Sequence, residues 1–466
     1  MKKEYNIGYL IFLSVVAALG GFLYGYDTAV ISGTISMVGI QFGLDSIAQG
    51  WYVGCALVGS IVGVLIAGYV GDHYGRKRSM ITSAILFTVS AAGCAISGSL
   101  NELVAYRIIG GVGIGVASII CPLYISELAV AKYRGRLVSC YQLAITIGFL
   151  GAYLANFALL NYSQSGAELS GWADKLFVKE VWRGMLGMET IPALLFFGVL
   201  FLIPESPRWQ IVNNQIAKAR VTFARVYTSN EAVDAQVKAV QDVNTDDEKS
   251  DWRLLFTPGI FKALLIGVAI AILGQFMGVN AVLYYGPKIF EDAGLSGGDS
   301  LFYQVMIGLV NTLTTVLALV IIDKVGRKNL IYYGVSGMII SLVVIAFYFV
   351  YGTQMGISSI FLLVFFLLYI FFCAVSICAV VWVLLSEMYP VKVRGLAMSI
   401  AGLSLWIGTY LIGQLTPWLL ANLTAAGTFI LFAVMCVPYM LIMWKLVPET
   451  SGKTLEEIEQ YWKGKK

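Results

Sequence analysis

GDHYGRKR, at residues 71–78, lies between two long apolar runs at 48–70 and 80–99. A shorter form of the motif, DKVGRK at 323–328, lies between two other apolar runs in the second half of the chain. An apolar run of about 20 residues is long enough to cross a bilayer as a helix. Each half therefore places the same basic motif between two predicted membrane spans.

Apolar runs of this length recur along the whole sequence. Of its 466 residues, 59% are apolar and 12% are charged, whereas a soluble protein has about 25% charged residues. The sequence therefore predicts an all-α integral membrane protein with twelve transmembrane helices. The predicted spans are 8–30, 48–70, 80–99, 102–125, 137–160, 183–203, 259–285, 301–322, 330–351, 358–386, 396–420 and 427–447.

Two more motif pairs extend the internal repeat. ELAVAKYRG at 127–135 returns as EMYPVKVRG at 387–395, and PES at 204–206 returns as PET at 448–450. Duplicated six-span halves predict two pseudo-symmetric six-helix bundles, a midplane binding site and an alternating-access cycle. The predicted domains are an N-terminal bundle at 1–203, linker helices at 204–257, a C-terminal bundle at 258–447 and a tail at 448–466.

The linker has apolar residues at helical spacing, which predicts short amphipathic helices, with a flexible tether as the alternative. These residues are Ile216, Ala219, Val221, Phe223 and Val226.

The loops define an orientation and exclude several classes of function. Lys and Arg gather in alternate loops, so both termini are predicted to be cytoplasmic, in a multi-pass protein of the cell (inner) membrane. The net charge of +4 is scattered in short clusters, which argues against a nucleic-acid partner. The seven cysteines lie in apolar runs, and His73 is the single histidine of the sequence. This pattern argues against a disulfide framework and a metal site. We therefore expect no cofactor and no enzymatic activity.

Two ionisable residues fall inside predicted spans, where such side chains are costly and are often functional. Asp27 lies in the first span and Arg107 lies in the fourth. A carboxylate beside a movable arginine is able to load and release a proton. The alternative is a static ion pair that locks the bundle.

Five motifs occur in order, namely GDHYGRKR, YRGR at 133–136, PESPRW at 204–209, DKVGRK and PETSGKTLEEIE at 448–459. Through them the chain resembles the sugar porter family of the major facilitators over essentially its whole length. GYDTAVISG at 25–33 and CYQLAI at 140–145 are most similar to bacterial xylose-proton symporters. The resemblance implies inward transport of a monosaccharide with a proton, coupled through Asp27 and Arg107.

Sugars require amides for paired hydrogen bonds and aromatic planes for stacking. The predicted substrate residues supply both inside spans, and the amides and Trp382 match sugar-contacting positions of the resembling family: Gln142, Gln275, Asn280, Tyr284, Asn311, Trp382 and Trp406. Gln275 and Asn280 are about 140° apart on a straight helix, so facing one cavity requires a break. Gly274 and Gly278 permit that break; the alternative is that they serve close helix packing.

Four residues, at three sites, depart from the family pattern. Gly274 and Leu405 replace residues that usually carry amides, and Cys378-Ala379 replaces a usual Gly-Pro in the tenth span. Lost amides weaken discrimination between sugars, so xylose is a leading hypothesis rather than a conclusion.

The basic motifs also predict a cytoplasmic gate. Asp72 and Asp323 close their spans, and each is expected to accept from a neighbouring helix N-terminus. Glu189 and Glu387 are expected to form salt bridges with Arg134 or Arg394. The full predicted gate is Asp72, Arg76, Glu127, Arg134, Glu189, Asp323, Arg327, Glu387 and Arg394.

Other functions of the same fold stay open. A passive sugar facilitator would have a similar cavity, and so would a non-transporting sugar sensor, although only about 20 residues follow the last span. The predicted partners are the monosaccharide, the proton and the lipid bilayer, and nothing requires more than a monomer.

Overall fold

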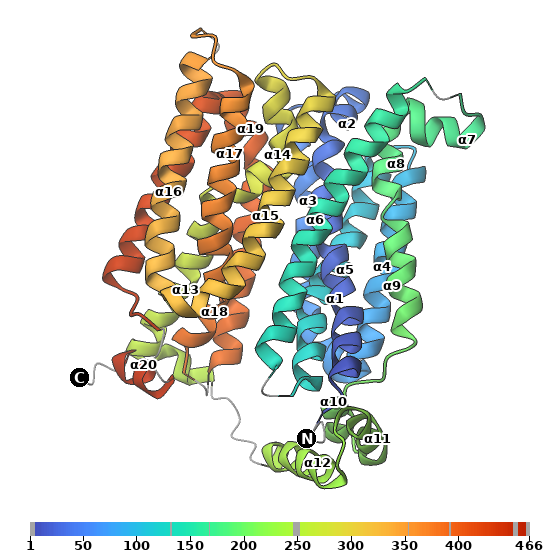
Figure 1. Cartoon of the computed structure of the whole chain (residues 1–466), viewed down its shortest axis with the longest axis vertical. Coiled ribbons are helices and arrows are strands. Elements are labelled where there is room, and N and C mark those ends of the chain that lie inside the picture. The colour runs from blue at the N-terminus through green and yellow to red at the C-terminus, as the bar shows by residue number, and fades with distance from the viewer. Residues whose placement is uncertain are drawn as a thin grey trace. The chain divides into compact units, whose positions relative to one another are not determined.

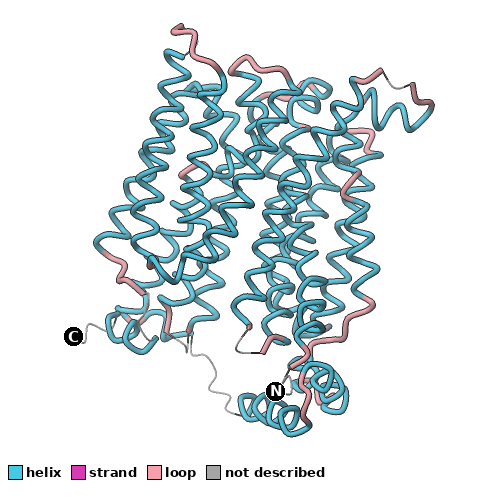
Figure 2. The backbone as a smooth tube through the Cα atoms, in the orientation of Figure 1, coloured by secondary structure: helices cyan, strands magenta, loops and turns pink. Residues whose placement is uncertain are grey.

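The computed structural model describes residues 5–130, 133–166, 168–245, 252–352, 354–390, 393–450 and 455–462. Its described residues form helices joined by short loops, with no strand among them (Figure 2). Parts of the predicted linker and tail, at 246–251, 451–454 and 463–466, lie outside the described residues.

Within this described part, eleven helices are long and apolar enough to cross a membrane. One of them, α19 (Arg394–Lys445), has 52 residues and breaks at Thr424, where φ is 63°. A span needs about 20 residues, so α19 supplies two spans. The prediction of twelve spans is therefore confirmed.

The first half of the chain forms six spans and a short helical segment between the fifth and the sixth. Its elements are α1 (Ile7–Val30), η1 (Ile31–Gly33), α2 (Ile35–Phe42), α3 (Ser46–Tyr74), α4 (Arg76–Ile96), α5 (Leu100–Leu128), α6 (Arg134–Gln164), α7 (Gly171–Asp174), η2 (Lys175–Lys179, a π-helix), α8 (Val181–Gly187) and α9 (Thr190–Leu200).

Short helices follow, as the linker pattern predicted. They are α10 (Pro207–Val212), α11 (Ile216–Val226), α12 (Asn230–Thr245) and η3 (Trp252–Phe256). Phe223 and Val226 are buried, but Val221 is exposed, because it points away from the packed face of α11. The start of α1 lies beside α11 (Figure 1), and Asn6 N donates to Val226 O over 2.9 Å.

The second half repeats the six spans and ends with a short helix. Its remaining elements are α13 (Pro258–Phe276), α14 (Val279–Asp292), α15 (Gly297–Val325), α16 (Arg327–Phe347), η4 (Tyr348–Gly352, a π-helix), α17 (Ser359–Cys373), η5 (Ala374–Cys378, a π-helix), α18 (Ala379–Met388) and α20 (Leu455–Trp462).

Small residues and polar caps explain how the spans start and pack. Ser99 accepts from Glu102 N at the start of α5, and Ser296 accepts from Asp299 N at the start of α15, which satisfies donors that a helix leaves open. A Cβ atom at Gly115 would lie 2.7 Å from Gly63 Cα. Such glycines allow close backbone approach, which helices in lipid use for packing.

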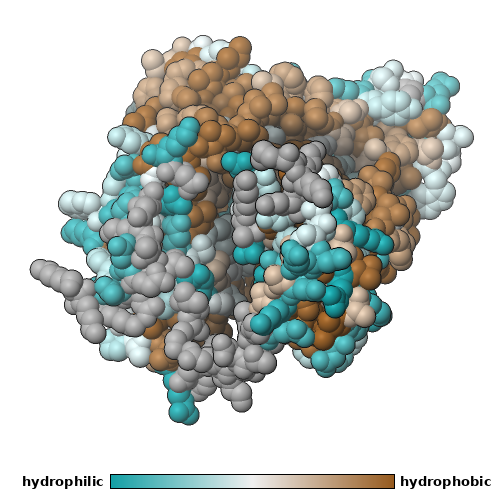
Figure 3. All heavy atoms as spheres, turned by 60° about the horizontal axis from the view of Figure 1, so that its bottom comes forward, coloured by the Kyte–Doolittle hydropathy of each residue, from teal (hydrophilic) through white to brown (hydrophobic). Residues whose placement is uncertain are grey.

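The chain divides into two compact units. The first comprises Met1–Val30, Val58–Ala155 and Glu168–Lys249, and the second comprises Ile31–Leu57, Asn156–Ala167 and Ser250–Lys466. The end of the first span and the start of the second span therefore belong to the same compact unit as the second half of the sequence. Hydrophobic side chains cover the helix flanks, and hydrophilic ones gather at the end that comes forward in Figure 3.

Candidate functional site

A buried ion pair joins α1 to α5 in the first unit. The side chain of Asp27 is 1% exposed and that of Arg107 is 3% exposed, and the Arg107 guanidinium donates to Asp27 Oδ1. It also donates to the Asp27 backbone carbonyl over 3.3 Å. Removing either partner would leave an uncompensated charge in an apolar interior, which is strongly destabilising. The two predicted proton-coupling residues are therefore in direct contact.

The second oxygen of Asp27 faces a glycine. A Cβ atom at Gly110 would lie 2.8 Å from Asp27 Oδ2, so the missing side chain makes room for the carboxylate. Among the described residues, Asp27 Oδ2 has no hydrogen-bond partner. One oxygen is thus held by the arginine, and the other is open to a proton.

Another buried carboxylate, Glu189, lies at the same site. It is 3% exposed, interacts electrostatically with Asp27 and Arg107, and its Oε1 has no hydrogen-bond partner within the described ranges. The predicted gate salt bridge for Glu189 at a cytoplasmic helix end is therefore wrong. The sixth span begins at Val181, so Glu189 lies in the interior of that span rather than at its end.

In the second unit, a helix break brings two predicted sugar-binding amides together. The seventh span stops at Phe276 and restarts at Val279, and Gly278 between them has a φ of 91°. Asn280 Nδ2 donates to Gln275 Oε1 over 2.7 Å across this break. The break predicted from Gly278 is therefore present, since five residues on an uninterrupted helix would point these amides apart.

A hydroxyl group that the sequence analysis did not single out joins the same cluster. Thr409 in α19 donates to Gln275 Oε1 over 3.1 Å. It lies one turn after Leu405, the position that departs from the family pattern, and three residues after Trp406. The sequence could have indicated Thr409, because it lies on the same face of the eleventh span as Trp406.

The other predicted substrate residues differ in burial. Tyr284, Asn311 and Trp406 are buried, while Trp382 is partly exposed, and a Cβ atom at Gly402 would touch the Trp382 ring at 3.5 Å. These four belong to the second unit, with Gln275 and Asn280. Gln142 lies half-buried in α6 of the first unit.

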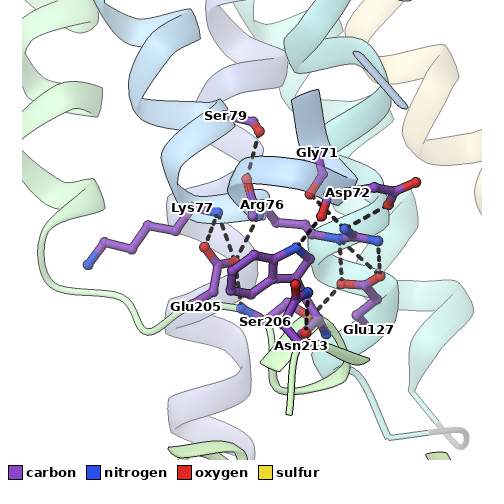
Figure 4. Close-up of polar contacts among 11 residues, drawn as sticks. Gly71, Asp72, Arg76, Lys77, Ser79, Glu127, Glu205, Ser206 and Asn213 are labelled. Carbon is purple, nitrogen blue, oxygen red and sulfur yellow. Dashed lines mark hydrogen bonds and ion pairs between the residues drawn. The ribbon is translucent and has the colours of Figure 1, made fainter. Parts of the chain in front are cut away.

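The basic motif of the first half builds a polar cluster at the ends of α3, α4 and α5 (Figure 4). Arg76 pairs with Asp72 at 2.9 Å and with Glu127 at 3.0 Å. Glu205 accepts from the backbone N–H groups of Arg76 at 2.8 Å and of Lys77 at 3.0 Å. The helix N-terminus is thus capped by Glu205 and not by Asp72 as predicted, because the Asp72 side chain is 77% exposed and turns to the Arg76 guanidinium.

Burial shifts the titration of the capping carboxylate, which lies outside the spans. Desolvation raises the pKa of Glu205 above its usual value, although hydrogen bonds from the Lys77, Ser206 and Arg76 backbone act in the opposite direction. The neutral form is therefore favoured by burial and the charged form by the helix N-terminus.

The second half builds the matching cluster. Arg327 pairs with Glu387 at 2.9 Å, and Glu449 accepts from the backbone N–H groups of Arg327 at 3.2 Å and of Lys328 at 3.0 Å. Asp323 lies in α15, and its side chain is outside the described residues.

Two predicted gate arginines have other neighbours. The expected pairing of Glu387 with Arg134 or Arg394 is wrong, because Arg327 starts the helix that faces Glu387. Arg394 Nε donates to the Tyr389 carbonyl over 3.3 Å, and Arg134 lines a small pocket beside Glu127.

Comparisons with known proteins agree on one family. A family model described as "Sugar (and other) transporter" matches residues 13–462. The arabinose-proton symporter of Bacillus subtilis (strain 168) is 36% identical, over 99% of this chain and 97% of that protein. The D-xylose-proton symporter of Escherichia coli (strain K12) is 37% identical, over 99% of this chain and 97% of that protein.

A solved structure has the same fold. The inward open conformation of the xylose transporter XylE from E. coli superimposes with a TM-score of 0.83 and 34% identity. The match covers 97% of this chain and all of that one.

Proposed function

Because the chain belongs to the sugar transporter family, we propose that it imports a monosaccharide together with a proton by alternating access. It is a transporter and not an enzyme. The observation that carries the proton part of the proposal is the buried group of Asp27, Arg107 and Glu189. Charged side chains are costly at that depth and mark ion or proton pathways.

The proton step follows from counting charges. Two buried carboxylates, Asp27 and Glu189, interact electrostatically with one arginine, so one negative charge stays uncompensated unless a proton binds. Protonation of Asp27 removes the attraction that holds the Arg107 guanidinium, and loss of the proton restores it. We propose that this exchange biases α1 and α5 between two arrangements.

The sugar part of the proposal is supported by the polar cluster around the seventh-span break. Gln275, Asn280 and Thr409 present amide and hydroxyl groups, and Trp382 and Trp406 present aromatic planes. A sugar needs both kinds of contact. The two sugar-proton symporters named above, for xylose and arabinose, favour a pentose as the first substrate to test.

We also propose that both termini are cytoplasmic, that the two halves act as pseudo-symmetric bundles joined by α10–α12, and that a monomer transports. The basic residues of alternate loops support the orientation. Single cysteines are introduced into the loops of the protein, and their labelling from outside in intact cells tests the orientation.

Uptake into proteoliposomes tests the function. The wild type is expected to accumulate one of xylose, arabinose or glucose above equilibrium when protons flow inward. Asp27→Asn is expected to keep sugar exchange and to lose accumulation, whereas Asp45→Asn, at an exposed site, serves as the matched control and behaves as the wild type. An active wild type that never exceeds equilibrium would show a passive facilitator and a static ion pair.

A further inference from the structure

We propose that Cys373 and Cys378 form a dithiol modification site, at which exchange with a small apolar disulfide closes an intrahelical disulfide that stops transport. The two sulfur atoms are 3.7 Å apart. Both cysteines are in the tenth span, in the second unit, and both are free thiols in the structure.

The pairing depends on a π-helix. Residues five apart are about 140° apart on an α-helix, so their side chains would point in different directions. The π-helix η5 begins directly after Cys373 and ends at Cys378, and a π turn bonds residues five apart. The two thiols therefore sit at the two ends of one turn, on the same face.

The two cysteines of this turn differ in exposure. Cys378 is partly exposed and Cys373 is buried, which gives the two sulfurs different roles. Cys378 is the accessible attacking thiol, and Cys373 is the sulfur that resolves the mixed disulfide.

The chemistry balances without a further oxidant. The Cys378 thiolate attacks one sulfur of the reagent and releases one reagent thiol, with the proton of Cys378 going to water or to that thiol. The Cys373 sulfur then attacks Cys378 Sγ and releases the second reagent thiol. The protein loses two electrons and two protons, and the reagent disulfide is reduced to two thiols.

The site adjoins the seventh-span break. Tyr369, one turn before Cys373, donates through its hydroxyl to the carbonyl of Met277 over 2.8 Å, and Met277 lies in the break itself. A Cβ atom at Gly274 would lie 3.5 Å from Ile377 Cγ2, inside the π turn. A covalent bond across η5 would therefore fix the segment that packs against the Gln275–Asn280 cluster.

Dithiodipyridine, a small apolar disulfide, is the probe. After treatment of the reconstituted protein, peptide mapping should find Cys373 linked to Cys378 with no pyridyl adduct on either residue. Cys373→Ala should keep the pyridyl adduct on Cys378, because the resolving sulfur is missing. This readout is independent of transport, so it separates failure of the site from failure of the proposed function.

Sugar uptake is the second readout and rests on the proposed function. Wild-type uptake should fall in proportion to the linked fraction and return with dithiothreitol. Cys140→Ser, which removes an exposed cysteine in α6, should lose uptake in the same way, and Cys378→Ala should keep it. Adducts on both cysteines without a link, or equal inhibition of Cys378→Ala, would overturn the proposal.

Discussion

Asp27 and Glu189 are two buried carboxylates that interact electrostatically with one guanidinium group, that of Arg107. The ion pair with Arg107 uses one carboxylate oxygen. Within the described part of the chain, Asp27 Oδ2 and Glu189 Oε1 have no hydrogen-bond partner. Buried polar atoms are usually hydrogen-bonded, so these two open oxygens are the atoms at which we expect a proton to bind.

Glu189→Gln should convert coupled transport into equilibration. The substitution removes the surplus negative charge, so the Asp27–Arg107 pair is satisfied without a bound proton. Sugar exchange should continue, while the inside and outside concentrations become equal under an inward proton gradient.

Exchange and accumulation measured on the same vesicles check this expectation. Glu168→Gln, at an exposed position between the fifth and sixth spans, is the matched control and should accumulate normally. Undiminished accumulation by Glu189→Gln would limit the proton site to Asp27.

Among the elements, the ends of α4 and α16 have the same design. The N-terminus of each helix is capped by a carboxylate that follows the last span of the same half, Glu205 for α4 and Glu449 for α16. The first residue of each helix is an arginine, and its side chain pairs with an acidic residue of another span. The helix N-terminus favours a negative charge, so these caps are stabilising.

Glu205 should make stability depend on pH. Its pKa is raised by burial, so the folded protein binds a proton that the unfolded chain has released. The part of the stability that comes from this proton is then complete below the unfolded pKa of about 4.3. It declines as the pH rises toward the raised pKa of Glu205 in the folded protein.

Thermal unfolding in detergent at several pH values tests the sign. The unfolding temperature of the wild type relative to that of Glu205→Gln should decrease between pH 4 and pH 7. Each unit by which the folded pKa exceeds the unfolded pKa corresponds to about 1.4 kcal/mol of unfolding free energy. Glu231→Gln, exposed on α12, should show no such trend. A difference that increases with pH would mean that the backbone hydrogen bonds outweigh burial.

The break between α13 and α14 depends on Gly278. Gly278→Ala introduces a side chain at a φ of 91°, which costs about 1 kcal/mol or more, and its Cβ atom would collide with the Phe432 ring. We expect a lower unfolding temperature and weaker sugar binding.

Gly294→Ala separates the two causes, because Gly294 has a φ of 94° and nothing within 4 Å of its Cβ position. It should show the backbone cost alone and leave sugar binding unchanged. Equal effects of the two substitutions would mean that the contact with Phe432 is unimportant.

The elements also show how far sequence reasoning reaches. Hydropathy and the repeated motifs predicted twelve spans, and the spacing of Gln275 and Asn280 predicted the break. The start of the sixth span was predicted within two residues of Val181, but Glu189 was still assigned to a gate at a span end. Its place near Asp27 and Arg107 was missed because hydropathy does not show which spans pack together. The partner of Glu387 was missed because motif order does not show which of several nearby arginines begins the facing helix.

For the whole molecule, the chain passes from the first unit to the second only four residues after Asp27, at Ile31. The segment that follows is held by the second unit. Thr34 and Tyr52 share a hydrogen bond of 2.8 Å, and Ser36 donates to Glu291 at the end of α14 over 2.6 Å. We therefore expect a change in the charge of Asp27 to reach α14 along η1 and α2.

Hydrogen exchange measured on variants tests this route. A hydrogen bond to a charged acceptor contributes about 1.5–3 kcal/mol, so Ser36→Ala should speed exchange in α2 and at the end of α14 by about tenfold or more. Glu291→Gln, which keeps a neutral acceptor for the Ser36 hydroxyl, should show a smaller increase. The double variant should exchange no faster than Ser36→Ala, since both substitutions act on one contact. Asp27→Asn should alter exchange in the same two segments if the route is used.

Ser296→Ala, which removes a cap at the start of α15, should change exchange there and nowhere else. Additive effects of Ser36→Ala and Glu291→Gln would show that the two residues stabilise separate parts of the structure, and the proton signal would then need another path.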